Sequence, residues 1–579
     1  MAGKRVVRVN KKAYFGYSKR DVEASLYFFY YRKVLQSVLI WRISLSYDTT
    51  LRGMHTMSRE NQHCGCVPGC KIYKEGRDDS LADNTEKTRI SQNLRENEKY
   101  IRKRCENCDD ILIRPMKLGD ERKVDCLMVY IEVAVSNMML DDSAIGKMVN
   151  HFWEISPDQI QEFVENNSLG IADVKKFSYM EDAFAAMLAG NAIFFIDGFD
   201  EAMKISSKGY PSMGVSEAET EKVLRGSKEG FSDGVKTNSA LVRKRLRDTR
   251  LKVVEHSVGT RSNTMLQMLY IDDLVREEFL EDVKERLDSF EIDGILDSGM
   301  LEQLTEDTWY SPFPQYQTTE RPDRAAQELL NGKIVLLCDN SPVALILPGA
   351  FNSFMESSED WYNRFEMASF LRLLRYLAML AATLLPGLYL AVIRFHTQIL
   401  PTNLILSFAE AREGVPFSSV VELVFLELSF ELIREAGVRI PGALGNAIGI
   451  VGGLIIGQAA VEANLVSPIV VMIVALTALG SLAIPNEEFA SAFRLLKYFF
   501  LFLGGYLGIY GIVLGAFLTV SHLAGLLSFG VPYLVPFVKK EPEKGVGSGI
   551  LRIPFNKRYQ RPIYAKKDES VRLKRREKQ

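Results

Sequence analysis

The sequence predicts a cytosolic region of two related α+β or α/β subdomains, followed by an all-α polytopic transmembrane domain. Amphipathic helical patterns alternate with short β-rich runs from Ser91 to about Pro348, as in a soluble region that packs helices on sheets. Three later stretches contain no Asp, Glu, Lys or Arg, namely residues 440–461, 463–486 and 498–538. These stretches exclude a wholly soluble globular protein and indicate an integral membrane protein.

Charge is segregated along the 579 residues. Residues 1–60 carry a net charge of +8, residues 539–579 carry +9, and residues 61–538 carry −19. Charged residues cut the apolar stretches near the N-terminus into pieces of about eight residues, which are too short for a signal peptide or a span. We therefore expect the soluble region and the basic C-terminal tail to be cytosolic.

An internal repeat relates the two halves of the soluble region. The run 127–132 (LMVYIE) returns as 267–272 (QMLYID), and the run 187–197 (MLAGNAIFFID) corresponds to 329–339 (LLNGKIVLLCD). In both copies of the second run, a helix stops at a glycine and a buried strand ends at an acidic turn that leads into a hairpin. Two related subdomains are therefore expected.

These patterns divide the chain into five parts. They are a basic, disordered N-terminal extension and linker, two soluble subdomains, a transmembrane domain and a basic tail: residues 1–90, 91–232, 233–350, 361–538 and 539–579.

The number of membrane spans is predicted to be four or six, because both ends of the chain are expected in the cytosol. Residues 376–393 are uncharged and would form a span of about 27 Å. The run 498–538 would extend about 60 Å as one helix, so it must break, and glycines at 504, 505, 508, 511 and 515 offer places. Six spans would place four cations on the cytosolic side, Arg434, Arg439, Arg494 and Lys497, but would carry carboxylates through the bilayer.

A charged face interrupts the otherwise apolar helix predicted near residues 415–437. Glu427, Glu431 and Arg434 fall on this face at helical spacing. The pattern suits an amphipathic helix at the membrane interface, which we favour, or a helix that lines a polar cavity.

Small and polar residues are combined in the next predicted span. Five glycines at mostly small-xxx-small spacing predict close helix packing, within or between subunits: Gly445, Gly449, Gly452, Gly453 and Gly457. Four polar residues are candidates for a pore or polar lining, because hydrocarbon penalises polar groups without partners: Asn446, Gln458, Glu462 and Asn464. A structural hydrogen-bonding role and a permeation role both fit these polar residues.

Motifs for catalysis are absent from the sequence. No P-loop, H-E-x-x-H or G-x-S-x-G sequence occurs and the six histidines are dispersed, so we expect no enzyme activity, no cofactor and no nucleic-acid partner. We expect no metal site at His63, Cys64, Cys66 and Cys70, because their spacing does not match common zinc modules.

Two further patterns have ordinary surface interpretations. Cys105 and Cys108 form C-x-x-C after a charged helical stretch, so surface thiols are expected. The basic run Arg243, Lys244, Arg245 and Arg247 suggests a solvated helix face, with contact to anionic lipid or to another subunit as the alternative.

Seven stretches resemble one family: ETEKVLRGSKEGF (219–231), EIDGILDSG (291–299), YSPFPQ (310–315), TERPD (319–323), AREGVPF (411–417), IGIVGGLIIGQAAVEANLVSP (448–468) and SFGVPYLVPF (528–537). Together they resemble the A-subunit family of spore germination receptors, the GerA family, over roughly residues 91–538. The resemblance implies a receptor subunit in the spore inner membrane, with B and C partner subunits and a soluble domain facing the spore core. It also implies homo-oligomerisation as a channel for monovalent ions.

Other interpretations stay open. A channel-associated paralogue shares the same motifs. A non-conducting scaffold that assembles other germination proteins would need the same packing and the same soluble surface. A solute transporter fits less well, because the repeat lies in the soluble region and not among the membrane helices.

Overall fold

The computed structural model describes residues 87–118, 124–135, 174–205, 209–210, 217–438, 443–538, 547–558, 560–566 and 571–572. The extension predicted over residues 1–90 lies almost wholly outside these ranges. His63, Cys64, Cys66 and Cys70 also lie outside them, as does Arg439.

The first sheet has five antiparallel strands in the order β1-β2-β4-β5-β3. Its strands and helices are β1 (Ile111–Leu118), β2 (Val124–Ile131), β3 (Val174–Phe177), β4 (Ala192–Ile196), β5 (Ala202–Ile205), α2 (Leu94–Arg104) and α6 (Met180–Leu188). Side chains alternate along β2, as the two-residue period of a strand requires. Leu127 and Val129 join the core beneath α2 and α6, whereas Met128 and Tyr130 join a core on the opposite face.

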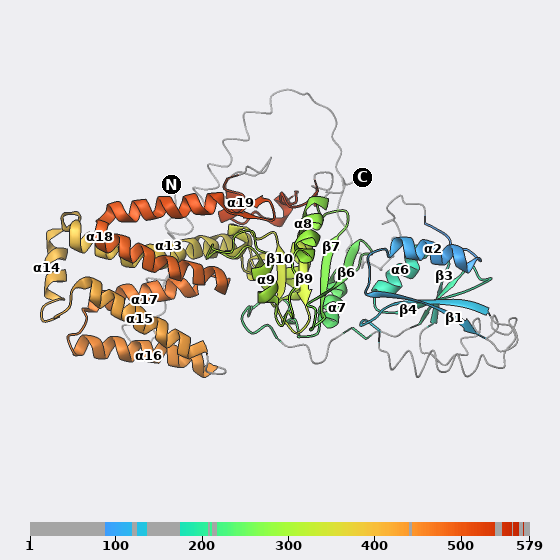
Figure 1. Ribbon diagram of the computed structural model, residues 1–579, viewed down its shortest axis with the longest axis horizontal. Helices are drawn as coiled ribbons and strands as arrows, with labels where there is room; N and C mark the ends of the chain where they lie inside the picture. The colour runs from blue at the N-terminus through green and yellow to red at the C-terminus, as the bar shows by residue number, and fades with distance from the viewer. Residues whose placement is uncertain are drawn as a thin grey trace, which may run out of the picture. The chain divides into compact units, whose positions relative to one another are not determined.

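The second sheet has the same strand order, β6-β7-β9-β10-β8, and is also antiparallel. Its elements are β6 (Leu251–Val258), β7 (Thr264–Ile271), β8 (Gln317–Thr319), β9 (Ile334–Cys338), β10 (Ala344–Leu347), α7 (Val235–Arg245), α8 (Glu277–Asp288), α9 (Ser298–Thr305) and α10 (Pro322–Leu329). Helices α8 and α9 pack on one face and α7 and α10 on the other (Figure 1). Antiparallel pairing throughout makes both sheets α+β.

The same hydrogen bonds recur in the two sheet regions. Asn97 accepts a hydrogen bond from the Ser91 amide at 2.9 Å and donates to the Ser91 carbonyl at 2.6 Å. Asn238 does the same with Ser232, at 2.8 and 2.6 Å. Each asparagine therefore ties the start of its helix to the incoming chain in the same way.

The acidic turns of the sequence repeat also have matching roles. Asp197, directly after β4, accepts a hydrogen bond from the first amide of α2 at 3.0 Å, and Asp339, directly after β9, accepts one from the first amide of α7 at 3.1 Å. Gly190 and Gly332 have φ values of +88° and +86°, the left-handed conformation that favours glycine after a helix. The repeated sequence runs thus occupy equivalent places in the two sheets.

Two surface predictions are wrong, one for both cysteines and one for Arg243 of the basic run, whereas Arg247 of that run is exposed. Cys105 and Cys108 are buried, at 7% and 5% exposure, and burial raises the pKa of the Cys105 thiol to about 12. Arg243 is fully buried, and its guanidinium contacts both carboxylate oxygens of Asp110, at 2.8 and 2.7 Å. The third nitrogen donates to the Leu251 carbonyl at 2.8 Å. Because Asp110 belongs to the first sheet region and Leu251 to the second, Arg243 joins the two regions instead of facing solvent.

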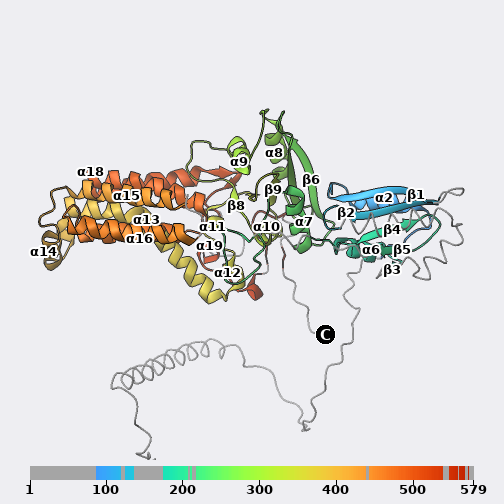
Figure 2. The same cartoon turned by 90° about the horizontal axis from the view of Figure 1, so that it is seen from below.

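The rest of the chain is mainly helical. Its elements are α11 (Phe351–Phe354), α12 (Glu359–Tyr362), α13 (Phe365–Phe395), η2 (Thr397–Ile399), α14 (Thr402–Glu410), α15 (Ser419–Val438), α16 (Ala443–Glu462), α17 (Pro468–Leu482), α18 (Glu487–Gly525), β11 (Leu527–Ser528), β12 (Val531–Pro532), α19 (Gly547–Ile550) and η3 (Phe555–Lys557). Figures 1 and 2 show α13, α15, α16, α17 and α18 running side by side. Among the described residues, α13 and α18 are long and apolar enough to cross a membrane, and α17 is a shorter apolar helix.

Helix α18 is two helical limbs joined at Gly508. This glycine has φ +64° and ψ −147°, which no helix contains. A Cβ added to Gly515 would lie 2.8 Å from Leu503 and 3.0 Å from Phe500, so the second limb returns along the first. The predicted break of the long apolar run is therefore confirmed, and each limb is about one hydrocarbon thickness long.

Candidate functional site

An aromatic cluster joins the second sheet region to the first limb of α18. Phe313 is buried, and its ring centroid lies 5.4 Å from that of Phe493, 6.2 Å from that of Phe489 and 6.4 Å from that of Tyr533. Phe354 stacks on Phe489 at 5.1 Å. Rings that interlock from four segments resist sliding, because interiors are packed to the density of organic crystals.

Polar contacts hold both ends of the α18 hairpin to the same region. The Asn486 side chain caps the helix by accepting from the Phe489 amide at 2.8 Å, and its nitrogen donates to Thr318 Oγ1 at 3.1 Å. Near the end of the second limb, His522 Nε2 lies 2.9 Å from Ser311 Oγ. A displacement of the second sheet region would therefore act on both limbs.

A group of three carboxyls lies beside this contact. Glu302 on α9 is buried and shares a hydrogen bond with Glu306. Burial, the nearby Glu488 and Glu306 raise the pKa of Glu302 to about 9. Glu302 therefore holds a proton at neutral pH.

A buried ion-pair cluster attaches the start of α13. Asp360, on α12, is 1% exposed and accepts from Arg372 Nε at 2.8 Å and from Arg375 at 2.8 and 3.0 Å. Arg372 also contacts Glu356 at 3.0 Å. Helix α13 is thus fixed to α12 by charges that would be costly to separate in a buried setting.

The loop 219–231, the first of the stretches that carry the family resemblance, connects to this cluster through Arg321. Arg321, which precedes α10, donates to the Ser227 carbonyl at 2.7 Å and pairs with Asp323 at 2.8 Å. Tyr362 on α12 donates to the same Asp323 at 2.5 Å. Four stretches that the sequence comparison singled out, 219–231, 310–315, 319–323 and 528–537, therefore meet around the junction between the second sheet and α13 and α18.

Within the helical region, the charged face of α15 packs against the first limb of α18. Lys497 Nζ lies 2.6 Å from Glu427 Oε2, and both side chains are buried. Glu431 Oε1 lies 3.6 Å from Arg494 Nε, and Arg434 is paired with Glu487. The interfacial and cavity roles of this face stay predictions.

Another carboxylate, Glu422, closes the loop that follows α14. It is 1% exposed, pairs with Arg412 at 3.0 Å and accepts from the Ser467 amide at 3.0 Å, at the start of α17. Arg412 belongs to the resembling stretch 411–417. The bond from α15 to α17 is therefore charge-assisted.

The predicted glycines of α16 are placed in two groups. Gly445 and Gly449, with Asn446, lie in a part of α16 for which the structure describes the backbone alone. A Cβ on Gly453 would lie 3.1 Å from Phe430 of α15, and one on Gly457 would lie 3.2 Å from Val471 of α17. A Cβ on Gly452 would meet Ile433 at 3.7 Å, which is ordinary contact. The packing role of these glycines stays a prediction.

The polar candidates of α16 face outward. Gln458 Nε2 donates to Glu462 Oε1 at 3.0 Å, and both residues are exposed. Asn464, in the turn after α16, is exposed and has φ +53°. The structure thus brings Gln458 and Glu462 together on an open face of the isolated chain and leaves their role a prediction.

Several residues of this site were missed by reasoning from the sequence. Phe313 and Arg321 lie within stretches that carry the family resemblance, but the sequence predicts no role for either residue. Lys497 was treated as a cytosolic-side charge, yet it lies ten residues into α18, about 15 Å from the start of the helix. A lysine deep in an apolar run was the available signal for a buried partner.

Comparison with known proteins decides the family. The family described as "Bacillus/Clostridium GerA spore germination protein" matches residues 99–564. This chain belongs to the GerA family. The resemblance noted in the sequence is confirmed, and two apolar helices of spanning length indicate membrane association of this GerA-family chain.

Individual relatives extend the comparison. This GerA-family chain is 40% identical over 466 residues to uncharacterized membrane protein YfkQ of Bacillus subtilis (strain 168), covering 80% of this chain and 90% of the relative. It is 37% identical over 483 residues to spore germination protein KA of the same organism, covering 83% and 88%. A crystal structure of the N-terminal domain of the A subunit of the Bacillus megaterium spore germinant receptor GerK3 aligns with 26% identity, 46% and 99% coverage and a TM-score of 0.36.

Proposed function

We propose that this chain is a membrane subunit of a spore germinant receptor that transmits the nutrient signal and conducts ions as a homo-oligomer. Membership of the GerA family and similarity to relatives such as spore germination protein KA support the germination role. B and C receptor subunits are the proposed partners, and the spore inner membrane is the proposed location.

The observation that carries the proposal is the junction around Phe313. It connects the second sheet region to both limbs of α18, through the aromatic cluster and the Ser311–His522 hydrogen bond. The Asp360 cluster connects the neighbouring α12 to α13. A shift of the soluble region on partner binding would move the apolar helices through these contacts, which is the mechanical requirement of a transmitting subunit.

The C-terminal segment supports an even number of membrane crossings. The Lys566 amide donates to the Leu274 carbonyl at 2.9 Å, and Arg276 Nε donates to the Ala565 carbonyl at 3.4 Å. These bonds hold residues 560–566 on the second sheet region, so the chain must return to the side on which it entered. We propose six crossings: α13, α15, α16, α17 and the two limbs of α18 (Figure 1). This proposal makes α15 a spanning helix instead of the interfacial helix that its sequence favoured.

The outward face of α16 supports oligomerisation and conduction. Glu462 ends α16 and Gln458 lies one turn before it, so in a lone chain both exposed side chains would meet lipid near the end of the span, where unpartnered polar groups are penalised. A neighbouring copy or a water-filled lumen would remove that penalty. A non-conducting scaffold would also satisfy these groups through subunit contacts, so it is retained as the second candidate.

Germination of variant spores tests the proposal. A strain whose other GerA-family genes are deleted would receive the wild-type chain, Phe313→Ala or Trp309→Ala, together with its B and C partners. Trp309 is the matched control, because it lies on the same segment and is 84% exposed. We expect Phe313→Ala to reduce the response to a panel of amino acids, sugars and nucleosides at equal membrane abundance, and Trp309→Ala to preserve it. Equal responses of all three strains would refute transmission through the junction.

A further inference from the structure

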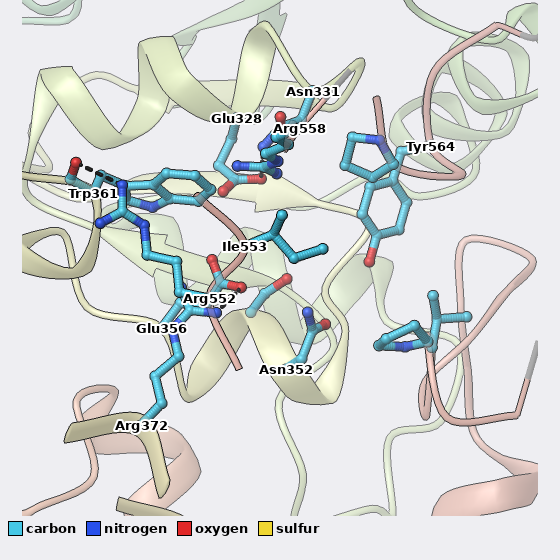
Figure 3. A pocket seen from close by; sticks show the side chains of 14 residues that line it. Glu328, Asn331, Asn352, Glu356, Trp361, Arg372, Arg552, Ile553, Arg558 and Tyr564 are labelled. Atoms are coloured by element: carbon cyan, nitrogen blue, oxygen red, sulfur yellow. Dashed lines mark hydrogen bonds and ion pairs between the residues drawn. The ribbon is translucent and has the colours of Figure 1, made fainter. Parts of the chain in front are cut away.

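A polar cavity of about 80 Å³ lies between the C-terminal segment and the start of α13. Its walls come from the end of α10, from α11 and α12, from α13 and from residues 552–564 (Figure 3). The residues that matter for its chemistry are Glu328, Glu356, Arg372, Arg552, Arg558 and Trp361. It belongs to neither the Phe313 junction nor the outward face of α16.

Two buried arginines at this cavity each have an N–H group with no partner in the part of the chain that the structure describes. Arg372 is 3% exposed and uses Nε on Asp360 and Nη1 on Glu356, and Nη2 bonds to no described residue. Arg552 is 7% exposed and donates to the Asn363 and Trp361 carbonyls, at 2.5 and 3.0 Å, through its two Nη atoms. Its Nε has no partner among the described residues. A buried donor without a partner is costly, particularly on a charged group.

Among the residues that line the cavity, arginines outnumber carboxylates. Three arginines and two glutamates line it, and each glutamate already has a cation: Lys333 lies 3.0 Å from Glu328, and Arg372 lies 3.0 Å from Glu356. Burial, Arg558 and Arg561 lower the pKa of the adjacent Arg572 to about 10. Burial and Arg372 likewise lower the pKa of Arg552. The lining therefore carries one more positive than negative charge, and Asp360, next to the lining, also pairs with Arg372.

The geometry fits a compact anion with several acceptor atoms. A water needs about 15 Å³ of such space, so the cavity has room for a group of about five heavy atoms, the size of a phosphate. Arg372 and Arg552 approach from different segments, and Arg558 is held over the Trp361 ring at 4.3 Å. Arginine forks recognise phosphate oxygens by charge-assisted hydrogen bonds.

We propose that this cavity binds a phosphate group, held by the free N–H groups of Arg372 and Arg552 and by Arg558. Asn352 Oδ1, which has no partner among the described residues, can accept from a phosphate hydroxyl. The cavity adjoins the start of an apolar helix of spanning length, so the phosphate belongs either to a soluble ester or to a phospholipid headgroup. Occupancy would tie the C-terminal segment to α13. The proposal does not depend on the germination role.

Binding to the purified full chain in a maltoside detergent tests the proposal. Inorganic phosphate, glycerol 3-phosphate and short-chain phosphatidic acid would each be titrated against chloride at constant ionic strength, with calorimetry and the melting temperature as readouts. We expect saturable binding and a raised melting temperature for at least one of the three. Binding by the soluble compounds identifies a soluble ester, and binding by phosphatidic acid alone identifies a lipid. Absence of binding by all three overturns the proposal.

Three substitutions localise the site. Arg552→Gln and Arg558→Gln should each weaken binding about tenfold or more, because each removes a charged donor. Arg561→Gln is the matched control, since Arg561 lies on the same segment, donates to the Leu330 and Val571 carbonyls and does not line the cavity. It should bind within about twofold of wild type. Equal weakening by Arg561→Gln and either lining variant would show general charge attraction and overturn the site. Arg558→Gln provides the test if Arg552→Gln does not fold.

Discussion

Lys497 on α18 and Glu427 on α15 form a buried ion pair, with Nζ and Oε2 2.6 Å apart and side chains 7% and 3% exposed. The pair joins two helices of the helical region, and its two residues lie 70 positions apart in the sequence. Burial removes both charges from water, so neither is stable there without the other. The pair therefore fixes the register of α15 against the first limb of α18.

Removing one member of this pair should destabilise the protein strongly. Glu427→Leu or Lys497→Met should each lower the free energy of unfolding by about 3–5 kcal/mol, because the other charge stays buried alone. The double variant Glu427→Leu with Lys497→Met should recover most of the loss. Unfolding in detergent, followed by circular dichroism, measures these values. Additive losses in the double variant would contradict the coupling.

The buried carboxyl of Glu302 predicts a pH dependence of stability. Its pKa is raised from 4.5 to about 9 in the folded chain, so its contribution is complete below about pH 4.5 and is lost as the pH rises through 9. The stability of wild type should fall by at least about 1 kcal/mol between about pH 5 and about pH 9. Glu302→Gln should reduce this slope, and burial of the neighbouring Glu306, which raises its pKa too, should leave a residual slope. Glu285→Gln, at an exposed glutamate on α8, should keep the full slope. A Glu302→Gln profile parallel to wild type would contradict the assignment.

The hairpin of α18 should depend on Gly508. Alanine at this position would need φ +64°, and its Cβ would lie 2.9 Å from His396 and 3.1 Å from Phe395. Gly508→Ala should therefore cost about 1–3 kcal/mol of unfolding free energy. Gly525→Ala is the matched control at the end of the same helix, where a Cβ meets nothing within 4 Å. Similar melting temperatures for the two variants would argue against a hairpin fixed at Gly508.

Packing of α16 against α15 should be needed for signalling. Gly453→Leu should force the helices apart, because even a Cβ there lies 3.1 Å from Phe430. The variant should abolish the germination response or make it independent of nutrient. Gly452→Ala, whose Cβ would lie 3.7 Å from Ile433, should respond as wild type does. A Gly453→Leu variant with the germination response of wild type would contradict the packing hypothesis.

The repeat and the apolar runs were predictable because each leaves a local pattern. The sequence match of 187–197 to 329–339 places a glycine, a buried strand and an aspartate at equivalent positions, and β4 and β9 are the strands within these two runs. Glycines in a run too long for one span predicted the break, which occurs at Gly508. These features depend on residues that are close in the sequence.

The junction was not predictable, because its contacts join distant parts of the chain. Phe313 meets Phe493 across 180 positions, and Arg243 meets Asp110 across 133. A basic run on a helix has the same local pattern whether its arginine is solvated or buried with a carboxylate. Burial of two opposite charges as a pair leaves no periodic pattern in the sequence. The burial of Arg243 and Lys497 could therefore be found only from the structure.

Ion flux through the purified chain tests the central claim most directly. Liposomes would contain wild type, Gln458→Leu, Glu462→Gln or the control Glu413→Gln, an exposed glutamate in the loop between α14 and α15. We predict cation flux for wild type and Glu413→Gln and an altered flux for the two α16 variants. Sealed liposomes that hold folded, oligomeric protein would contradict conduction by this subunit and favour the scaffold.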